Sequence, residues 1–357
     1  MSTRVNSGRA WVDVNLEHLL ANARAVLARA PRARLLPMVK ANAYGLGAVP
    51  CARALERLDP WGFGVATVEE GIELRDAGIT RPLLVLTPAV GAQRAAFRRY
   101  DLRAVLDRPE VADRWDGPFH LEVDTGMARC GVRWDDASAL AACASPQLEG
   151  AFTHFFAADT SPESVDAQWQ RFTEAVARLG RRPALLHVAN SAGVWRLHDQ
   201  LDLVRPGIYV YGGQHAPDLP PPLPVAAVRA PVVSVRRVAA GDGVSYGADW
   251  RAPAPTTIAT LGIGYADGLP RAVQGKAAAL LHGRRYPVVG RIAMDFIMLD
   301  VGAAPPALAI GEAATLIGAD GEEAITVDEV AGWAGTIAYE ILARLGPRVP
   351  RIYTGAA

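Results

Sequence analysis

The chain has 357 residues, half of them hydrophobic, and its 37 basic residues balance 37 acidic ones. This length allows two domains with a substantial core, and the zero net charge gives no electrostatic footprint for binding nucleic acid or an anionic membrane. The three cysteines form no CxxC pair, which is typical of a reducing cytosol. The sequence shows neither an apolar signal segment nor a run of about 18 apolar residues, so we expect a cytoplasmic protein.

The first two-thirds of the chain alternates short apolar runs with amphipathic segments. After a helix at 17–30, strands are predicted at 34–40, 62–66, 83–87, 102–106, 119–124, 149–155, 184–189 and 202–205. Helices are predicted at 48–58, 68–77, 91–100, 109–115, 134–145, 162–179 and 191–198. Eight strands alternating with helices are typical of a parallel (β/α)8 barrel. The alternative is an open doubly wound sheet, whose glycine-rich fingerprint after the first strand is weak here.

A proline-rich segment then separates the alternating strands and helices from a region of mainly strands. Residues 216–231 contain six prolines, which disfavour a helix or a central strand. Beyond it, strands are predicted at 232–238, 256–263, 277–281, 286–289, 296–301 and 313–317, with one helix at 327–345. The sequence therefore predicts a TIM-like barrel at 12–215, a junction at 216–231 and a mainly β domain at 232–357.

Lysine is rare in this chain. Only Lys40 and Lys276 occur, against 35 arginines. Biased base composition explains the arginine content, but it leaves two candidates for any chemistry that needs an amine, because a guanidinium does not deprotonate in proteins. Lys40 ends the first predicted barrel strand, on the face where such barrels carry their active sites. An apolar setting disfavours the charged amine and makes it a better nucleophile, although a lysine lying along the rim is an equal alternative. Lys276 looks like an ordinary solvated charge.

Other polar residues fall at the carboxyl ends of later strands. Arg129, His154, Ser191 and Arg205 follow or end the fifth to eighth strands. Barrels often bind phosphate after the last two strands, and Ser191 with the amides of Gly207 and Ile208 suits that role. Each also has a structural interpretation, as a helix cap, a core histidine or an ion-pair member. The histidines lack zinc-binding spacing, so no metal site is expected, and no nucleophile elbow or P-loop occurs.

Nine motifs resemble the alanine racemase family, in the family's order and over nearly the whole chain. They are VKANAYGLG (39–47), HLEVDTGMARCG (120–131), FTHF (152–155), HVANSAG (187–193), VRPGIYVYG (204–212), VSYGADW (244–250), IGYADGLPR (263–271), VGRIAMDFIMLDV (289–301) and IAYEILARLGPRVPR (337–351). The resemblance implies a barrel that binds pyridoxal 5′-phosphate (PLP) and a β domain on which residues 1–11 pack. It also implies a homodimer whose active sites use residues of both chains.

The resemblance assigns a role to each matching residue. Lys40 would hold PLP and act as the base on one face of the substrate, and Tyr246 from the partner subunit would act on the opposite face. Two bases on opposite faces of a planar carbanion allow inversion. Further cofactor contacts would come from Tyr44, Arg129, His154, Ser191, Arg205, Gly207, Ile208 and Tyr339. Arg129 and the Met294 amide would bind the substrate carboxylate. His154 would hydrogen-bond Tyr246, and His187 would hold Arg205, which faces the pyridine nitrogen.

Some positions depart from the family pattern. Glu122 stands where many members have a carbamylated lysine, and we hypothesise that it supplies the negative charge directly to Arg129. Other differences near the substrate mouth concern substrate choice more than reaction type; they are Leu46, Ala128, Ala293, Phe296 and Ala338. The leading interpretation is an alanine racemase that supplies D-alanine for peptidoglycan. The alternatives are a racemase of serine or a basic amino acid, a fold-type III decarboxylase, whose glycine-rich loop and cysteine motif are not evident, and a non-catalytic PLP-binding protein.

Overall fold

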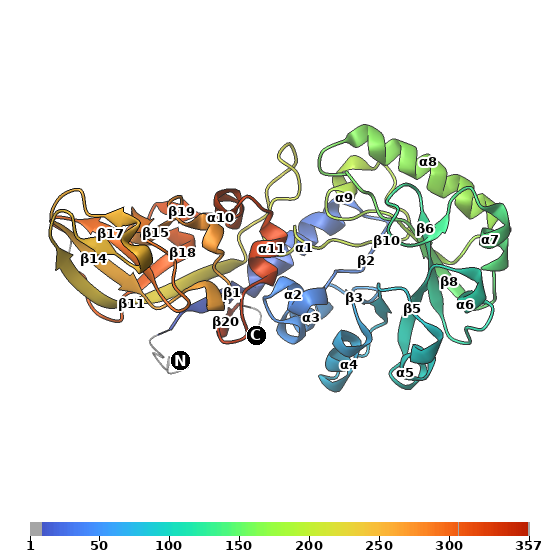
Figure 1. Ribbon diagram of the computed structural model, residues 1–357. Helices are drawn as coiled ribbons and strands as arrows, with labels where there is room; N and C mark the ends of the chain where they lie inside the picture. The colour runs from blue at the N-terminus through green and yellow to red at the C-terminus, as the bar shows by residue number, and fades with distance from the viewer. Residues whose placement is uncertain (1–8, 306, 356–357) are drawn as a thin grey trace. The chain divides into compact units, whose positions relative to one another are not determined.

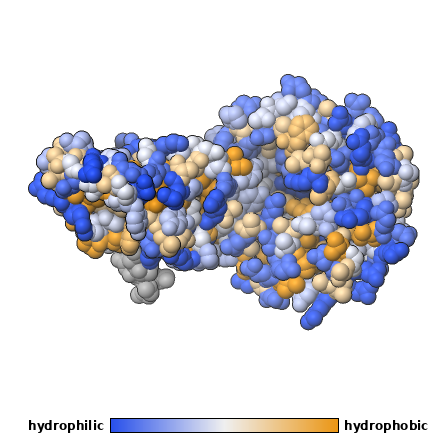
Figure 2. Space-filling model, in the orientation of Figure 1, coloured by the Kyte–Doolittle hydropathy of each residue, from blue (hydrophilic) through white to orange (hydrophobic). Residues whose placement is uncertain are grey.

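The computed structural model describes residues 9–305 and 307–355. These residues divide into two compact units. The barrel unit comprises residues 19–223, and the β unit combines residues up to 18 with residues from 224 onward (Figure 1). Figure 2 shows hydrophilic residues across the visible face, with smaller hydrophobic areas between them. Within the described ranges, no helix is long and apolar enough to cross a membrane.

The barrel unit is built on parallel strands. One run of neighbours is β3 (Phe63–Val65), β4 (Leu83–Val85), β5 (Leu102–Leu106), β6 (Phe119–Asp124), β8 (Leu148–Phe152) and β9 (Leu185–His187), with the short β7 (Val132–Arg133) beside β6. A second pair consists of β2 (Arg34–Leu35) and β10 (Leu203–Val204). Most residues of these strands are buried and apolar, as expected for parallel strands that are covered on both faces.

Backbone hydrogen bonds join the two runs into a closed barrel. On one side the amide of Val39 donates to the carbonyl of Gly64 at 2.8 Å, which continues β2 into β3. On the other side the amide of Arg205 donates to the carbonyl of Ala189 at 2.9 Å, which joins β10 to β9. The predicted (β/α)8 architecture is therefore confirmed, and each predicted strand of this region is present.

Helices surround the strands of the barrel unit (Figure 1). They are α1 (Leu16–Arg29), α2 (Lys40–Tyr44), α3 (Ala48–Glu56), α4 (Val68–Asp76), α5 (Arg94–Arg99), α6 (Pro109–Ala112), α7 (Ala137–Ala142), α8 (Pro162–Arg178) and α9 (Gly193–Arg196). Local sequence signals explain where the longest begins, because the Ser161 hydroxyl accepts from the Ser164 amide and Pro162 occupies the first helical position.

The β unit contains a large mainly antiparallel sheet. Among the described residues its order is β19 (Glu323–Ile325), β18 (Ala313–Asp320), β15 (Ala278–Leu281), β16 (Arg284–Val289), β17 (Ile297–Gly302), β14 (Thr256–Leu261), β11 (Ala226–Val238), β1 (Trp11–Asn15) and β20 (Arg351–Thr354). β11 also pairs with β18, which curls the sheet back on itself. β12 (Gly243–Val244) and β13 (Trp250–Arg251) form a separate two-stranded sheet, and in the sequence they lie between β11 and β14. The predicted mainly β second domain is confirmed.

Three details differ from the sequence-based expectation. First, β11 begins at Ala226, so part of the predicted junction 216–231 is strand. Pro231 forms the last pair of β11 with β18 and stands next to the register shift at Val232/Ser234 in the pairing with β14, where its missing N–H costs little. Second, Val12 to Asn15 pair with β11 and β20, so they belong to the β unit and not to the barrel. Third, the predicted helix 327–345 is two helices, α10 (Val327–Ala334) and α11 (Ala338–Ala343), because Gly335 ends α10 with φ 69°. Of the predicted packing segment 1–11, residues 1–8 lie outside the described residues.

Candidate active site

Most of the predicted site residues gather at the carboxyl ends of the barrel strands. Lys40 follows β2, Arg129 follows β6, His154 follows β8, Ser191 follows β9, and Arg205 follows β10. The electrostatic environment shows that they lie close to one another, because the charges of Lys40, Arg129 and Arg205 all lower the pKa of His154. The structure therefore brings Lys40, Arg129, His154 and Arg205 together on the face where barrel enzymes carry out their chemistry. Ser191 joins the same end of the barrel through its bond with the Gly207 amide, two residues after Arg205.

Lys40 opens a turn with an unusual backbone. The next four residues, Ala41 to Tyr44, all have φ between 52° and 54°, which is the left-handed region. Glu70, in the first turn of α4, holds this turn: its carboxylate accepts from the Ala41 amide at 2.7 Å and from the Ala66 amide at 2.6 Å. The segment behind Lys40 is thus fixed by a buried strand on one side and a charge-assisted anchor on the other.

The amine of Lys40 lies in an environment that favours its neutral form. Burial lowers the pKa of Lys40, the positive charges of Arg129 and Arg205 lower it further, and the carboxylate of Glu70 opposes them. A larger neutral fraction makes the amine a better nucleophile and a better proton acceptor near neutral pH. Lys276, in contrast, is exposed, and its amine donates to the Trp333 carbonyl at 3.2 Å.

A ring of donors lies between Tyr44, Ser191 and the segment after β10. The Ser191 hydroxyl accepts from the Gly207 amide at 3.0 Å. A Cβ added to Gly207 would lie 2.1 Å from the Tyr44 hydroxyl oxygen, so only glycine lets the two approach this closely. The ring of Tyr44 stacks on that of Tyr211 at 4.7 Å between centroids. Hydroxyls and amides that converge in this way are the donors that phosphate groups take.

The amide of Ile208 strengthens this interpretation. Ile208 is fully buried, and in the part of the chain that the structure describes its N–H has no hydrogen-bond acceptor. Buried backbone N–H groups without a partner are rare in folded proteins. A phosphate oxygen bound between Tyr44, Ser191 and this amide would provide the acceptor.

Arg205 is held on one side and open on the other. Its Nη1 donates to the carbonyl of His187 at 2.8 Å and lies 2.8 Å from Nδ1 of the same histidine, while Nη2 donates to the Thr153 carbonyl at 2.8 Å. Burial lowers the pKa of Arg205 to about 10, so the guanidinium remains charged at neutral pH. Its Nε has no partner among the described residues, which leaves one donor for a ligand.

Glu122 is buried in β6, and burial raises its pKa to about 6, against the opposing charges of Arg129 and Arg205. The expected hydrogen bond between Glu122 and Arg129 is not present among the described residues, because Arg129 lies in the exposed loop after the strand. The interaction between them is a longer-range attraction of charges. Burial, followed by the charges of Arg205, Arg129 and Lys40, lowers the pKa of His154 to about 3, so this imidazole is neutral at physiological pH.

The remaining predicted residues belong to the β unit. Tyr246 opens a single turn after Ser245 and is 70% exposed. Met294 lies in the loop between β16 and β17 and is 52% exposed, and Tyr339 is the second residue of α11 and 39% exposed. All three residues thus lie on the surface of the β unit.

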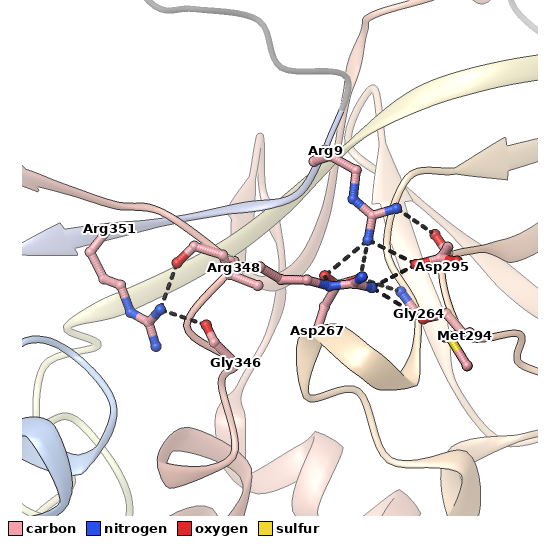
Figure 3. Close-up of polar contacts among 9 residues, drawn as sticks. Arg9, Gly264, Asp267, Met294, Asp295, Gly346, Arg348 and Arg351 are labelled. Carbon is pink, nitrogen blue, oxygen red and sulfur yellow. Dashed lines mark hydrogen bonds and ion pairs between the residues drawn. The ribbon is translucent and has the colours of Figure 1, made fainter.

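An ion-pair network holds the Met294 loop (Figure 3). Asp267, only 2% exposed, accepts from Arg9 at 2.8 Å and from Arg348 at 2.7 Å. Arg348 also donates to Asp295 at 2.7 Å and to the Met294 carbonyl at 3.4 Å. The backbone beside Met294 is therefore tied to the turn at Asp267 and to the segment that enters β1.

Sequence reasoning missed several residues that shape this site. Glu70 occupies the fourth position of a Thr67-x-x-Glu70 pattern, which indicates a helix cap, and the Thr67 hydroxyl does accept from the Glu70 amide. The Glu70 carboxylate, however, also accepts from the Ala41 amide of the Lys40 turn, which the pattern does not indicate. Tyr211 donates its hydroxyl proton to the Met38 carbonyl at 2.7 Å. His120 lies against His187 inside the barrel. The alternation of residues along β6 could have indicated that His120 faces inward, but no sequence signal identified its partner.

Comparisons with known proteins place the chain in a family. The profile of the alanine racemase N-terminal domain matches residues 14–215, and that of the alanine racemase C-terminal domain matches residues 225–353. The chain belongs to the alanine racemase family. It is 39% identical to an alanine racemase of a Nostoc species, over 97% of this chain and 96% of the relative, and 38% identical to one of Carboxydothermus hydrogenoformans, over 96% and 99%.

Solved alanine racemase structures have the same fold. One from Streptomyces lavendulae superposes with a TM-score of 0.90 at 34% identity, over 98% of both chains. Another from Bacillus anthracis, with bound L-Ala-P, gives 0.89 at 34% identity, over 97% of this chain and 95% of the other. Alanine racemases are isomerases that use PLP, and this chain's residues suit that cofactor. The lysine with a lowered pKa, the Ile208 amide without an acceptor and the open donor of Arg205 match its aldehyde, phosphate and pyridine nitrogen.

Proposed function

We propose that this chain interconverts L-alanine and D-alanine, with PLP bound on Lys40. One observation carries the proposal: a lysine with a lowered pKa stands beside a phosphate-type donor ring, in a chain that matches alanine racemases over nearly its full length. PLP, when bound, supplies an electron-withdrawing group that stabilises negative charge at the α-carbon. Lys40 holds it, and Tyr44, Ser191 and the amides of Gly207 and Ile208 bind its phosphate.

Two bases on opposite faces of the substrate α-carbon remove and return its proton. Lys40 removes or returns the α-proton on one face, and Tyr246 of the partner subunit acts on the other. The lowered pKa of Lys40 supports the first role, because a base needs a neutral amine. The 70% exposure of Tyr246 is compatible with the second. In the same proposal His154 hydrogen-bonds Tyr246, and Arg129 and the Met294 amide bind the substrate carboxylate.

Arg205 limits the chemistry to racemisation. A guanidinium cannot accept a proton, so Nε of Arg205 would hold the pyridine nitrogen of bound PLP unprotonated and would restrain the cofactor as an electron sink. His187 fixes the orientation of Arg205, which its 2.8 Å contact supports. Tyr339 completes the cofactor contacts.

The wider proposal concerns assembly and context. The protein forms a homodimer with shared active sites, resides in the cytoplasm and supplies D-alanine for peptidoglycan. The relatives' printed name, alanine racemase, supports the formation of D-alanine, and the zero net charge supports a protein with neither nucleic-acid nor membrane partners. We keep the division into a cofactor-binding barrel and a β domain, with the boundaries at 18/19 and 223/224 that the compact units favour.

The test follows the α-proton by NMR. The PLP-loaded enzyme is incubated in D2O with L-alanine, L-serine or L-lysine, and each product is analysed for chirality. Loss of the alanine α-proton signal with formation of D-alanine supports the proposal, and the panel ranks the substrates. Release of an amine and carbon dioxide would identify a decarboxylase instead. Lys40→Ala should abolish both PLP absorbance and turnover, whereas Lys276→Ala, at the exposed lysine, should leave both unchanged.

The hypothesis for Glu122 has its own test. Glu122→Gln removes the negative charge near Arg129 with little change in shape. Because Glu122 interacts with Arg129 through charge, the variant should raise KM for alanine severalfold. Wild-type kinetics in Glu122→Gln would refute the idea that this carboxylate replaces a carbamylated lysine.

A further inference from the structure

A line of buried polar side chains crosses the interior of the barrel from Arg205. Nδ1 of His187 lies 2.8 Å from Nη1 of Arg205, and Nε2 of His187 lies 2.7 Å from Nδ1 of His120. Nε2 of His120 lies 3.4 Å from Oε2 of Glu149. Both histidines are completely buried. The line starts at the carboxyl end of the strands, after β10, and ends at Glu149 near the amino end of β8.

Hydrogen-bond chemistry gives this line one direction. Arg205 can only donate, so Nδ1 of His187 must accept and its proton must be on Nε2. That proton is donated to Nδ1 of His120, which places the proton of His120 on Nε2 as well. This second N–H is carried by Nε2, the atom that lies 3.4 Å from the carboxylate of Glu149, and a carboxylate can only accept when ionised. The donor at one end and the acceptor at the other therefore demand the same tautomer of both rings.

The protonation states agree with this arrangement. Burial lowers the pKa of His187 and that of His120, so both rings are neutral. Burial alone would raise the pKa of Glu149, but the contact with His120 and the charge of Arg103 outweigh it and lower that pKa, so the carboxylate is ionised. Nε of Arg103 lies 3.6 Å from Oε2 of Glu149.

The barrel interior makes room for the line. A Cβ on Gly150, in β8, would lie 2.5 Å from Nδ1 of His120, so a larger residue there would displace the ring. The Trp61 ring packs against His120 at 5.4 Å, and the Phe152 ring stacks on His187 at 5.0 Å. The loosest link is the one to Glu149: neither Nε2 of His120 nor Oε2 of Glu149 has a hydrogen bond of normal geometry in the described residues. The two atoms nevertheless lie 3.4 Å apart, so each is close enough to become the hydrogen-bond partner of the other.

We propose that Glu149 is a positioning residue for Arg205, acting through His120 and His187. The negative charge at the far end polarises both imidazoles and makes Nδ1 of His187 a stronger acceptor, because hydrogen bonds in a chain strengthen one another in a low dielectric. A stronger acceptor fixes the guanidinium and keeps its Nε aimed at the ligand side. Comparable outer partners of a metal-bound histidine change activity by about 10–100-fold.

The first experiment examines the tautomers and does not depend on turnover. The full-length protein, labelled with 15N in histidine, is studied by NMR between pH 6 and 8.5, and His120→Phe identifies the signals of that ring. The expected result is two neutral rings, His120 and His187, each protonated on Nε2. A proton on Nδ1 of either ring, or a charged ring, overturns the proposal. If His120→Phe fails to fold, the two rings are assigned in the unmodified chain through their contacts, His120 with Trp61 and His187 with Phe152.

The second experiment tests the coupling and rests on the proposed racemase function. Glu149→Gln should lower kcat about 10-fold and leave KM unchanged. In the His120→Phe background the same change should have less than about a twofold effect, because the connection is already broken. Glu174→Gln is the matched control: it removes a carboxylate paired with an arginine at 3.3 Å that touches no histidine, and it should leave kcat unchanged. Additive effects, or an unchanged kcat in Glu149→Gln, would overturn the proposal. Absence of any racemase activity would refute the function and leave the NMR result to judge the tautomers.

Discussion

Replacing Asp267 by asparagine is expected to destabilise the β unit strongly. Asp267 is 2% exposed and pairs with Arg9 and Arg348, whose side chains are 30% and 42% exposed. Its carboxylate also accepts from the Gly264 amide at 2.8 Å. Asparagine keeps one oxygen for these donors but turns an N–H toward a guanidinium. A hydrogen bond to a charged group contributes about 1.5–3 kcal/mol, and removing one partner of a buried pair costs about 3–5 kcal/mol.

Water reaches both arginines and offsets part of this loss, so we expect a decrease of about 3 kcal/mol in the free energy of unfolding. For a unit of this size that lowers Tm by roughly 6–12 °C, measured by circular dichroism. Asp249→Asn is the control, because Asp249 and its partner Arg291 are 41% and 42% exposed, and such pairs contribute about 0–1 kcal/mol. Equal Tm values for the two variants would refute the reasoning from burial.

Two further predictions concern the barrel unit. Gly207→Ala should weaken PLP binding at least about 10-fold in an absorbance titration, because its Cβ would collide with the Tyr44 hydroxyl; Gly332→Ala, with no atom within 4 Å of the added carbon, should bind PLP normally. Acid should destabilise the protein through His154, whose folded pKa of about 3 lies below its ordinary value of about 6.5. Between these values the unfolded state binds one more proton, so stability falls as pH decreases, by up to about 1.4 kcal/mol per pH unit. His154→Gln should flatten that part of the stability curve measured by urea unfolding, and an unchanged slope would exclude His154 as its cause.

Local sequence patterns determined the barrel but not the pairing of distant strands. The strands from β3 to β9, apart from the two-residue β7, are mostly apolar and bounded by turn residues, so each could be recognised alone. β1 could not be assigned correctly, because its neighbours in the sheet are β11 and β20, more than 200 residues away. The strand through Pro231 was missed for the same reason: this proline is tolerated where the β18 pairing ends, next to a register shift opposite β14.

In the candidate site, too, sequence patterns predicted the positions of residues along the chain but not their contacts with distant residues. The position of Lys40 at the end of a strand was predictable, because strand ends and barrel topology follow from pattern alone. The contact of Glu70 with the Lys40 turn was not, since its local pattern equally indicates an ordinary helix cap. The partner of His120 depends on the relative register of β6, β8 and β9, which no single segment encodes.

The turn after Lys40 reverses a familiar substitution rule. In an ordinary helix, glycine in place of alanine is unfavourable by about 0.5–1 kcal/mol. At Ala41 and Ala43, with φ near 53°, the alanine side chain is the unfavourable one, by about 1–2 kcal/mol for each residue. Ala41→Gly or Ala43→Gly would therefore remove backbone strain from the folded state, but it would also raise the conformational entropy of the unfolded state. Alanine at these positions leaves the segment after Lys40 fewer backbone conformations than glycine would, so the sequence here gives up folded-state stability for a single placement of the Lys40 amine.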